Sequence, residues 1–232
     1  MPPISSGLCA ICGERLPGLH AIEGEMRCEL CRRAEPPYLK AVAYGSYEGG
    51  LRELIHLLKY QQVRPAANVL GRMLSEAITD LALVLGGKTV VIPVPLHARK
   101  LRQRGFNQSE LIARAALKAI STRNQFELCS AAMERRRETQ SQIGLSRHQR
   151  RENMRGAFAV IRPELVAARE VLLVDDVFTT GTTASECARA LRRAGASKVF
   201  VATVARTLKA EVQHVVSQLE ERESHMAAAA AG

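Results

Sequence analysis

The chain has 232 residues, of which 47% are hydrophobic and 24% are charged, with a formal net charge of +10. This length allows one α/β domain of ordinary size with a small appendage, and the apolar content excludes a disordered chain. No segment approaches the ~20 consecutive apolar residues of a membrane-spanning helix, and the first eight residues lack the basic and apolar regions of a secretory signal. We therefore expect a cytoplasmic protein without a membrane span.

The positive charge is concentrated in two short segments. Residues 99–104 contribute +4, and residues 135–155 contribute +5 from seven arginines and two glutamates. A uniformly solvated surface would not gather its charge in this way. The pattern indicates an anionic partner such as phosphate, pyrophosphate or nucleic acid.

The first predicted unit contains four of the six cysteines. Cys9-x-x-Cys12 and Cys28-x-x-Cys31 are separated by fifteen residues, a spacing typical of two thiolate turns that close on one tetrahedral zinc ion. Four protein ligands leave no open position, so this zinc would be structural. Two disulfides or a redox dithiol are the alternatives. Glu35-Pro36-Pro37 then interrupts the chain, which predicts a zinc module over residues 1–36.

The main domain is expected over residues 37–222, and its first half alternates strand and helix patterns. In chain order we predict a strand at 39–47, a helix from Gly49-Gly50 through Leu58, a helix at 66–85, a buried strand at 89–94, a helix at 107–120 and a strand at 127–133. The basic segment at 99–104 is expected to be a loop.

The second half predicts a parallel sheet. A polar loop with one helical turn at 135–155 precedes a buried strand at 171–174, a helix at 183–194 and a strand at 198–204. Strands and helices in this order form parallel sheets with right-handed crossovers, whose ligands bind beyond the carboxyl ends of the strands. Residues 208–221 are expected to form a surface helix, and the alanine-rich residues 223–232 an unstructured tail.

The strand at 171–174 leads into the most specific motif of the chain. Two carboxylates, Asp175 and Asp176, precede a hydroxyl-rich turn that consists of Thr179, Thr180, Gly181, Thr182 and Thr183. Inward-facing amides, threonine hydroxyls and a helix N-terminus form a cradle for a dianionic phosphate. The carboxylates can accept hydrogen bonds from ribose hydroxyls and help to hold a magnesium ion. The alternative is an ordinary strand end followed by a helix N-cap.

This motif resembles the 5-phosphoribosyl 1-pyrophosphate (PRPP) motif of type I phosphoribosyltransferases. The resemblance implies that Asp175 and Asp176, the expected catalytic residues, hold the ribose hydroxyls, and that residues 179–183 bind the 5-phosphate. If the site is active, an acceptor attacks C1 of the ribose as magnesium pyrophosphate leaves. Catalysis then depends on positioning, metal and cations, without a protein nucleophile.

Two further stretches narrow the resemblance. They are Pro95-Leu-His-Ala-Arg99-Lys-Leu-Arg102-Gln-Arg104-Gly105-Phe106-Asn107-Gln108-Ser109-Glu110-Leu111 and Arg137-x-Thr139-x-x-Gln142-x-x-Leu145-x-x-x-x-Arg150-x-x-Asn153. With the cysteines and the phosphate motif they are similar to the ComF family, named for competence for DNA uptake, from Cys9 to about Arg206. The family implies a zinc ribbon ahead of an α/β domain of the type I phosphoribosyltransferase kind, a parallel sheet flanked by helices.

The resemblance also supplies the remaining candidate residues. The candidates for pyrophosphate binding are Pro95, Leu96, Arg99, Arg102 and Arg104. For the three arginines, an exposed helix face or a nucleic-acid patch is the alternative. The candidates for a mobile loop that covers the ligand are Thr139, Gln142, Arg150 and Asn153. For these four, the alternative is a solvated polar loop with capping roles.

Two classes of function follow. The first is a protein that binds PRPP with magnesium and transfers the phosphoribosyl group, in DNA uptake or nucleotide-related metabolism. The second is a non-catalytic adaptor that binds single-stranded DNA with the same fold, with proteins of the competence machinery as further partners. Aromatic residues are only 4% of the chain and tryptophan is absent, which disfavours a base-stacking platform but permits phosphate contacts.

Overall fold

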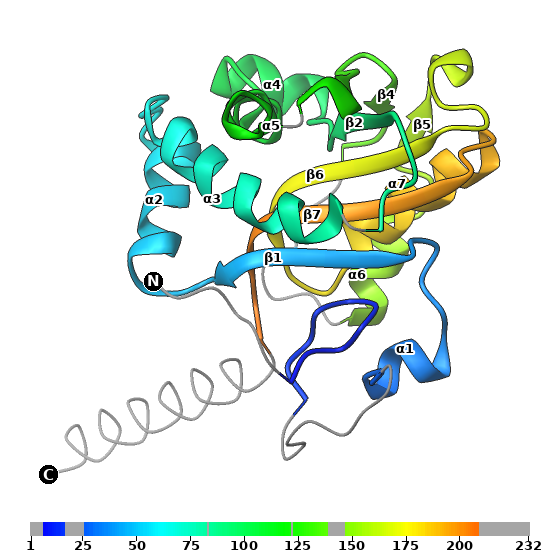
Figure 1. Ribbon diagram of the computed structural model, residues 1–232. Helices are drawn as coiled ribbons and strands as arrows, with labels where there is room; N and C mark the ends of the chain where they lie inside the picture. The colour runs from blue at the N-terminus through cyan, green and yellow to red at the C-terminus, as the bar shows by residue number, and fades with distance from the viewer. Residues whose placement is uncertain (1–6, 17–25, 83, 122, 139–146, 209–232) are drawn as a thin grey trace, which may run out of the picture.

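The computed structural model describes residues 7–16, 26–82, 84–121, 123–138 and 147–208. A central sheet of parallel strands runs in the order β1-β7-β6-β2-β3 (Figure 1). Its strands are Lys40–Ser46 (β1), Thr89–Pro93 (β2), Phe126–Leu128 (β3), Glu170–Phe178 (β6) and Lys198–Arg206 (β7). The sheet confirms the α/β class predicted from the sequence.

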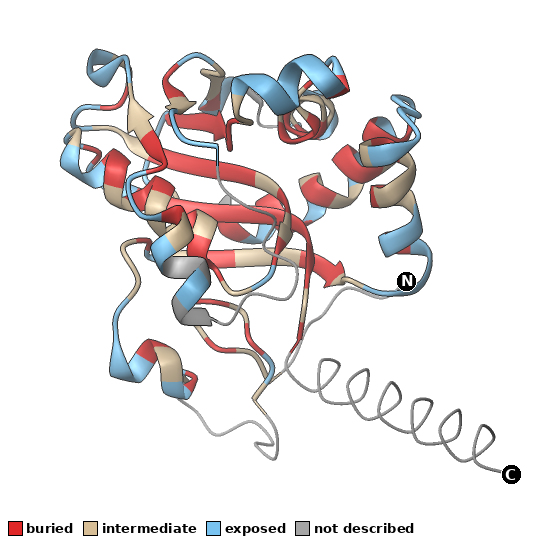
Figure 2. Ribbon diagram, turned by 180° about the vertical axis from the view of Figure 1, so that it is seen from behind, coloured by how far each residue is buried: buried red, intermediate tan, exposed pale blue. Residues whose placement is uncertain are grey.

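Helices cover both faces of the sheet. One face carries α2 (Gly49–Tyr60), α3 (Ala66–Ala82) and α5 (Gln108–Ala119), and the other carries α7 (Thr182–Arg193). Successive strand residues point to opposite faces, so Leu172 packs in the cluster with α2, α3 and α5, and Leu173 packs with α7. The central strands are accordingly buried over most of their length (Figure 2).

The segment predicted as one strand at 127–133 forms parts of two separate strands. β3 ends at Leu128, and a turn then leads to β4 (Met133–Arg135), which pairs antiparallel with β5 (Phe158–Val160) in a second small sheet. The prediction of one strand was wrong. The amide of Cys129 makes the last bond to β2, residues 130–132 then form a turn, and Met133 begins a strand of the other sheet.

Both arginine-rich segments contain helices: one replaces the loop predicted at 99–104, and the other is longer than the single helical turn predicted within 135–155. Residues 99–104 belong to α4 (Ala98–Arg104), which ends where Gly105 takes a left-handed conformation with φ of 77°. The second segment contains the end of β4 and, further on, α6 (Arg147–Met154). Three short elements complete the described chain, namely α1 (Glu29–Arg33), η1 (Arg123–Gln125) and η2 (Pro163–Leu165).

β6 continues four residues beyond the predicted end at Val174. β7 stays hydrogen-bonded beside it, with Asp175 opposite Thr203 and Phe178 opposite Arg206. The two acidic residues therefore lie inside a strand, because strand pairing supplies the backbone bonds that side-chain polarity alone would not predict.

The cysteine segment packs against the outer edge of the sheet. The amide of Ala41 in β1 donates to the carbonyl oxygen of Ile11 at 2.6 Å, and the cysteines share one buried cluster with the α7 side of the sheet (Figure 1). Within the described ranges, no helix is both long and apolar enough to cross a membrane. The predicted helix at 208–221, apart from Leu208, and the predicted tail lie outside those ranges.

Candidate functional site

The two carboxylates of β6 have different surroundings. Because Asp175 and Asp176 are consecutive in a strand, their side chains point to opposite faces. The Ser109 hydroxyl, at the start of α5, donates to Asp175 Oδ1 at 2.9 Å. Lys59 Nζ, from α2, lies 2.8 Å from Asp176 Oδ2, and these two side chains are only 17% and 6% exposed. The Asp176 carboxylate thus forms a buried ion pair with Lys59.

The protonation of Asp175 is balanced near neutrality. Burial, and then the charge of Asp176, raise the pKa of Asp175 to about 7, while Lys59 and the Ser109 hydroxyl oppose the rise. For Lys59, burial lowers the pKa, but the charge of Asp176, the hydrogen bond to it and the charge of Asp175 together outweigh burial, so the net pKa is raised. Lys59 is therefore a permanent cation, and Asp175 can be neutral or ionised.

The segment between β6 and α7 forms a tight turn. Gly181 has φ of 74°, and a Cβ atom there would lie 2.7 Å from Phe178 Cζ and 3.3 Å from the Tyr38 hydroxyl, so a side chain would be excluded. The Thr180 and Thr182 hydroxyls are 2.8 Å apart. α7 begins at Thr182, so its first amides face the turn.

The turn and Asp175 line the same small pocket. This cavity has a volume of about 20 Å³, and its wall comes from the ends of β2 and β6, from β7 and from the start of α7; it includes Val94, Asp175, Thr179, Gly181, Thr182 and Thr183. Thr180 lies on the other side of the turn and lines a neighbouring pocket beside the cysteine segment. Most of the predicted phosphate motif therefore meets one carboxylate in one cavity.

The candidates after β2 do not form one cluster. Pro95 and Leu96 follow β2 directly, where the Val94 amide still bonds to Val174 of β6 at 2.9 Å. Arg99 is exposed and reaches Glu138 at 3.3 Å, and Arg102 is also exposed. Arg104 is buried, donates to Gln108 Oε1 and lies 5.9 Å above the Tyr60 ring. The exposed Arg99 and Arg102 therefore lie in a different environment from the buried Arg104.

Basic residues from several segments complete the surroundings of Asp175 and Asp176. The side chain of Lys100 is exposed, but partial shielding from water by its neighbours and then the charges of Arg104, Arg135 and Lys59 lower its pKa, so three other cations lie close enough to act on it. Arg135 forms an isolated parallel β-bridge with His97, and its Cζ lies 5.5 Å from the centroid of the Phe158 ring. Burial lowers the pKa of Arg135, and the charges of Cys187 and Asp175 oppose this shift. Lys59 and Arg135 come from distant segments, and only the fold shows that they are neighbours.

The loop candidates are only partly described. Thr139 and Gln142 lie outside the described residues, and Arg150 and Asn153 belong to α6. Arg137 donates from Nη2 to the carbonyl oxygens of Asn153 at 3.0 Å and Arg155 at 2.8 Å. The arginine that precedes the loop is therefore tied to the helix that follows it.

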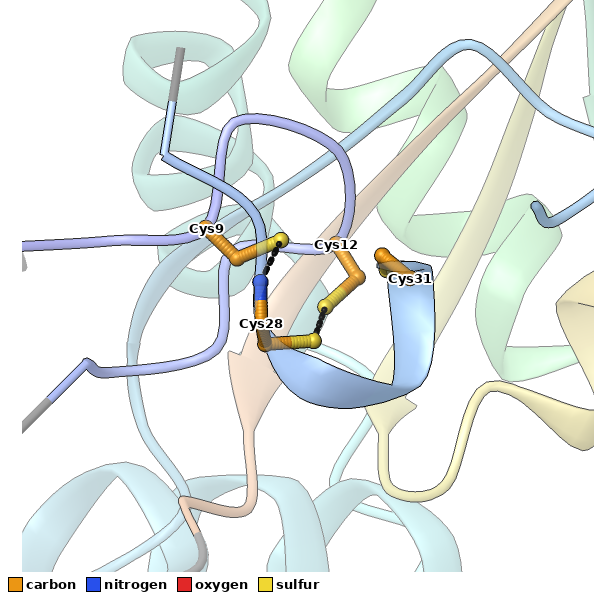
Figure 3. A group of neighbouring side chains, drawn as sticks. All are labelled: Cys9, Cys12, Cys28 and Cys31. Carbon is orange, nitrogen blue, oxygen red and sulfur yellow. Dashed lines mark hydrogen bonds between the residues drawn. The ribbon is translucent and has the colours of Figure 1, made fainter. Parts of the chain in front are cut away.

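The four N-terminal cysteines converge as their spacing predicts. The Sγ atoms of Cys9, Cys12, Cys28 and Cys31 all lie within 4.8 Å of one another, and all four residues are buried (Figure 3). Cys28 precedes α1 and Cys31 lies within it, so one short helix presents both. The Cys28 amide donates to Cys9 Sγ at 3.2 Å, a contact that favours the thiolate form. The set could hold a metal ion such as zinc.

The parallel sheet, the turn at the start of α7 and the adjacent carboxylates define a protein of the phosphoribosyltransferase fold. A family model described as "phosphoribosyl transferase domain" matches residues 130–226. DNA utilization protein YhgH of Escherichia coli is 33% identical over 87% of this chain and 91% of its own. Competence protein F of Haemophilus influenzae is 31% identical over 85% of this chain and 84% of its own. The chain belongs to the ComF family.

One solved structure, titled as the allosteric regulatory enzyme of purine biosynthesis, is 22% identical to this chain with a TM-score of 0.38. The match covers 61% of this chain and 26% of the other, so the chain spans about a quarter of that protein.

Proposed function

We propose that the glycine turn at the start of α7 and the adjacent end of β6 bind PRPP together with magnesium. The observation that carries this proposal is that Asp175 and the glycine turn at the start of α7 line the same cavity. The amides of the turn and the positive end of α7 suit a terminal phosphate. Asp175, which lines the cavity, would then receive the ribose hydroxyls and the magnesium ion; Asp176 would share this role on exchanging its ion pair with Lys59 for the ligand.

The cations beside the carboxylates suit the pyrophosphate end of this ligand. Lys59, Lys100, Arg104 and Arg135 act electrostatically on one another or on the two aspartates. Like charges gathered in this way are stabilised when a polyanion binds between them. In the same proposal Thr139, Gln142 and Arg150 contribute to a covering loop, phosphoribosyl transfer releases pyrophosphate, and residues 1–36 hold a structural zinc ion.

Calorimetric titration of the whole chain with PRPP and magnesium tests this proposal. We expect saturable heat from the wild type and none from Asp175→Ala/Asp176→Ala. Asp80→Ala removes an exposed carboxylate from α3, so this control should bind as the wild type does. Absence of heat in the wild type, or equal heat in the double variant, would contradict the proposal.

A second candidate function is binding of single-stranded DNA. Residues 98–103 of α4 are all exposed and contain three basic residues and no acidic one, and relatives are named for DNA utilization and competence. Such a surface favours phosphate contacts whose affinity falls with salt. We propose this as the route by which the chain would serve DNA uptake.

Fluorescence anisotropy with labelled single-stranded DNA tests the second candidate. Arg99→Glu/Arg102→Glu should weaken binding and reduce its salt dependence. Lys88→Glu/Lys118→Glu is a matched control, because Lys88 precedes β2 whereas α4 follows it, and both lysines are exposed. Equal losses in the two double variants would indicate attraction by net charge alone and would contradict the assignment to α4.

A further inference from the structure

Arg206 connects the cysteine segment to the end of the central sheet. It is the last residue of β7 and lies opposite Phe178 in the ladder with β6. Its Nη1 donates to the Cys12 carbonyl oxygen. Its Nη2 lies 2.9 Å from Glu14 Oε2 and 3.8 Å from Cys12 Sγ. One guanidinium group thus contacts a candidate metal ligand and an acidic residue two positions further on.

The same guanidinium contacts Phe178, whose ring packs against the turn at Gly181. Its Cζ lies 4.6 Å from the centroid of the Phe178 ring, a distance typical of a cation–π contact. The Phe178 ring also packs edge-on against Tyr38, with centroids 6.2 Å apart. These two aromatic side chains are the groups that leave no room for a Cβ at Gly181. Arg206, Phe178 and Gly181 therefore form a continuous line of contact.

Because Arg206 is buried, its contacts with Phe178, and through Phe178 with Gly181, depend on the conformation of the cysteine segment. The side chains of Arg206 and Glu14 are only 5% and 8% exposed, and a buried charge is costly unless it is paired. If the segment around Cys12 and Glu14 loses its shape, Arg206 loses the partners that hold it against Phe178. The ring is then free to move, and the turn at Gly181 loses its support.

We infer that Arg206 is a positioning residue through which metal binding at the four cysteines orders the phosphate turn. The naming of zinc and PRPP rests on the proposed function above, whereas the contacts from Cys12 to Gly181 do not. A lysine at this position could still pair with Glu14, but it has no planar group to stack on Phe178 while bonding to the Cys12 carbonyl. Arg206→Lys therefore keeps the positive charge at this position but removes the group that holds Phe178 in place.

Hydrogen exchange measured on the full chain, zinc-loaded and chelator-stripped, tests the coupling without any ligand. Stripping should accelerate exchange of the amides at 178–183, with coupling of the usual allosteric size of about tenfold, and leave residues 171–174 unchanged. Zinc-loaded Arg206→Lys should show the same local acceleration with one zinc per chain. Arg169→Gln breaks the 2.8 Å ion pair with Glu127 at the other end of β6 and should leave residues 178–183 unchanged.

A second variant keeps the test decisive if substitution of Arg206 impairs folding. Phe178→Leu keeps an apolar side chain but removes the ring between Arg206 and Gly181. In this variant, exchange at 181–183 should no longer respond to zinc. Persistent zinc sensitivity in Phe178→Leu would overturn the inference. So would unchanged exchange at 178–183 in the stripped wild type, or an equal acceleration at 171–174, which would report general unfolding.

Calorimetry separates this inference from the proposed function. If the wild type binds PRPP, zinc-loaded Arg206→Lys should bind it about tenfold more weakly, in keeping with the same coupling. Unchanged affinity in that variant would overturn the link to the phosphate turn. If the wild type shows no PRPP binding, the proposed function fails, and the exchange experiment still decides whether the metal site orders the turn.

Discussion

Asp175 gives the proposed ligand site a dependence on pH near neutrality. With its pKa raised to about 7, this carboxyl is protonated in mild acid and must lose a proton before it can hold magnesium. We expect PRPP affinity, measured by calorimetry between pH 5.5 and 8.5, to rise with pH up to about 7, by up to about tenfold per unit. The same shift makes the folded protein less stable as the pH rises from ~4 to about 7, because the folded state binds the extra proton.

The Ser109 hydroxyl provides the control for this pH dependence. Its hydrogen bond to Asp175 Oδ1 lowers the pKa of that carboxyl, so Ser109→Ala should move the midpoint of the affinity profile to higher pH. Phosphate groups of the ligand titrate near ~6, but they do so equally with both proteins. A midpoint that is identical in the two proteins would assign the profile to the ligand and not to Asp175.

Lys59 is the residue whose loss we expect to cost most stability near the site. Lys59→Met leaves the buried Asp176 carboxylate without the ammonium group 2.8 Å away. Breaking a buried pair in this way should lower the free energy of unfolding in urea by about 3 kcal/mol. Lys198→Met is the control: Lys198 is 46% exposed and pairs with Glu170, so about 1 kcal/mol or less should be lost. Equal losses in the two variants would show that the buried Lys59–Asp176 pair stabilises the protein no more than the partly exposed Lys198–Glu170 pair.

At the scale of elements, the turn between β6 and α7 depends on Gly181. A Cβ there would meet Phe178 at 2.7 Å with φ of 74°, so Gly181→Ala should strain the turn by about 1–3 kcal/mol and weaken PRPP binding about tenfold. In Gly50→Ala, a Cβ on α2 meets nothing within 4 Å, and this control should gain roughly 0.5–1 kcal/mol in stability. Calorimetry and urea unfolding measure both, and normal ligand binding by Gly181→Ala would contradict this role.

The elements predicted correctly are those whose side chains carry a one-sided or fully buried pattern. β2 is buried at every position, and the apolar stripes of α2 and α5 face the core, so composition and spacing suffice to find them. α4 lacks such a stripe, because residues 98–103 are all exposed, and its charges favoured a loop. β6 was predicted too short, because the pairing with β7 that extends it is not visible in its own sequence.

The residues of the candidate site also fall into those that the sequence predicted and those that it did not. Asp175 and the turn at 179–183 follow one another along the chain, so the motif predicted that they would share a site. Ser109, Lys59, Arg135 and Arg206 come from four other segments and reach the site through the order of the strands and the packing of helices. Ser109 and Arg135 lie in stretches that the sequence marks for other reasons, but their contact with the site, like that of Lys59 and Arg206, follows only from the tertiary structure.

At the scale of the whole molecule, the cysteine segment protects the edge strand β1. The Ala41 amide bonds to the Ile11 carbonyl oxygen on the outer side of the sheet, and edge strands with unpaired amides promote association between chains. We therefore expect chelation of a bound metal to expose this edge and cause self-association, measured by size-exclusion chromatography with light scattering.

Cys9→Ser should associate even without chelator, because it removes one of the four thiols. Cys129→Ser, which alters a thiol outside that group, should respond to chelator as the wild type does. A chelated wild type that stays monodisperse at high concentration would show that β1 needs no such cover.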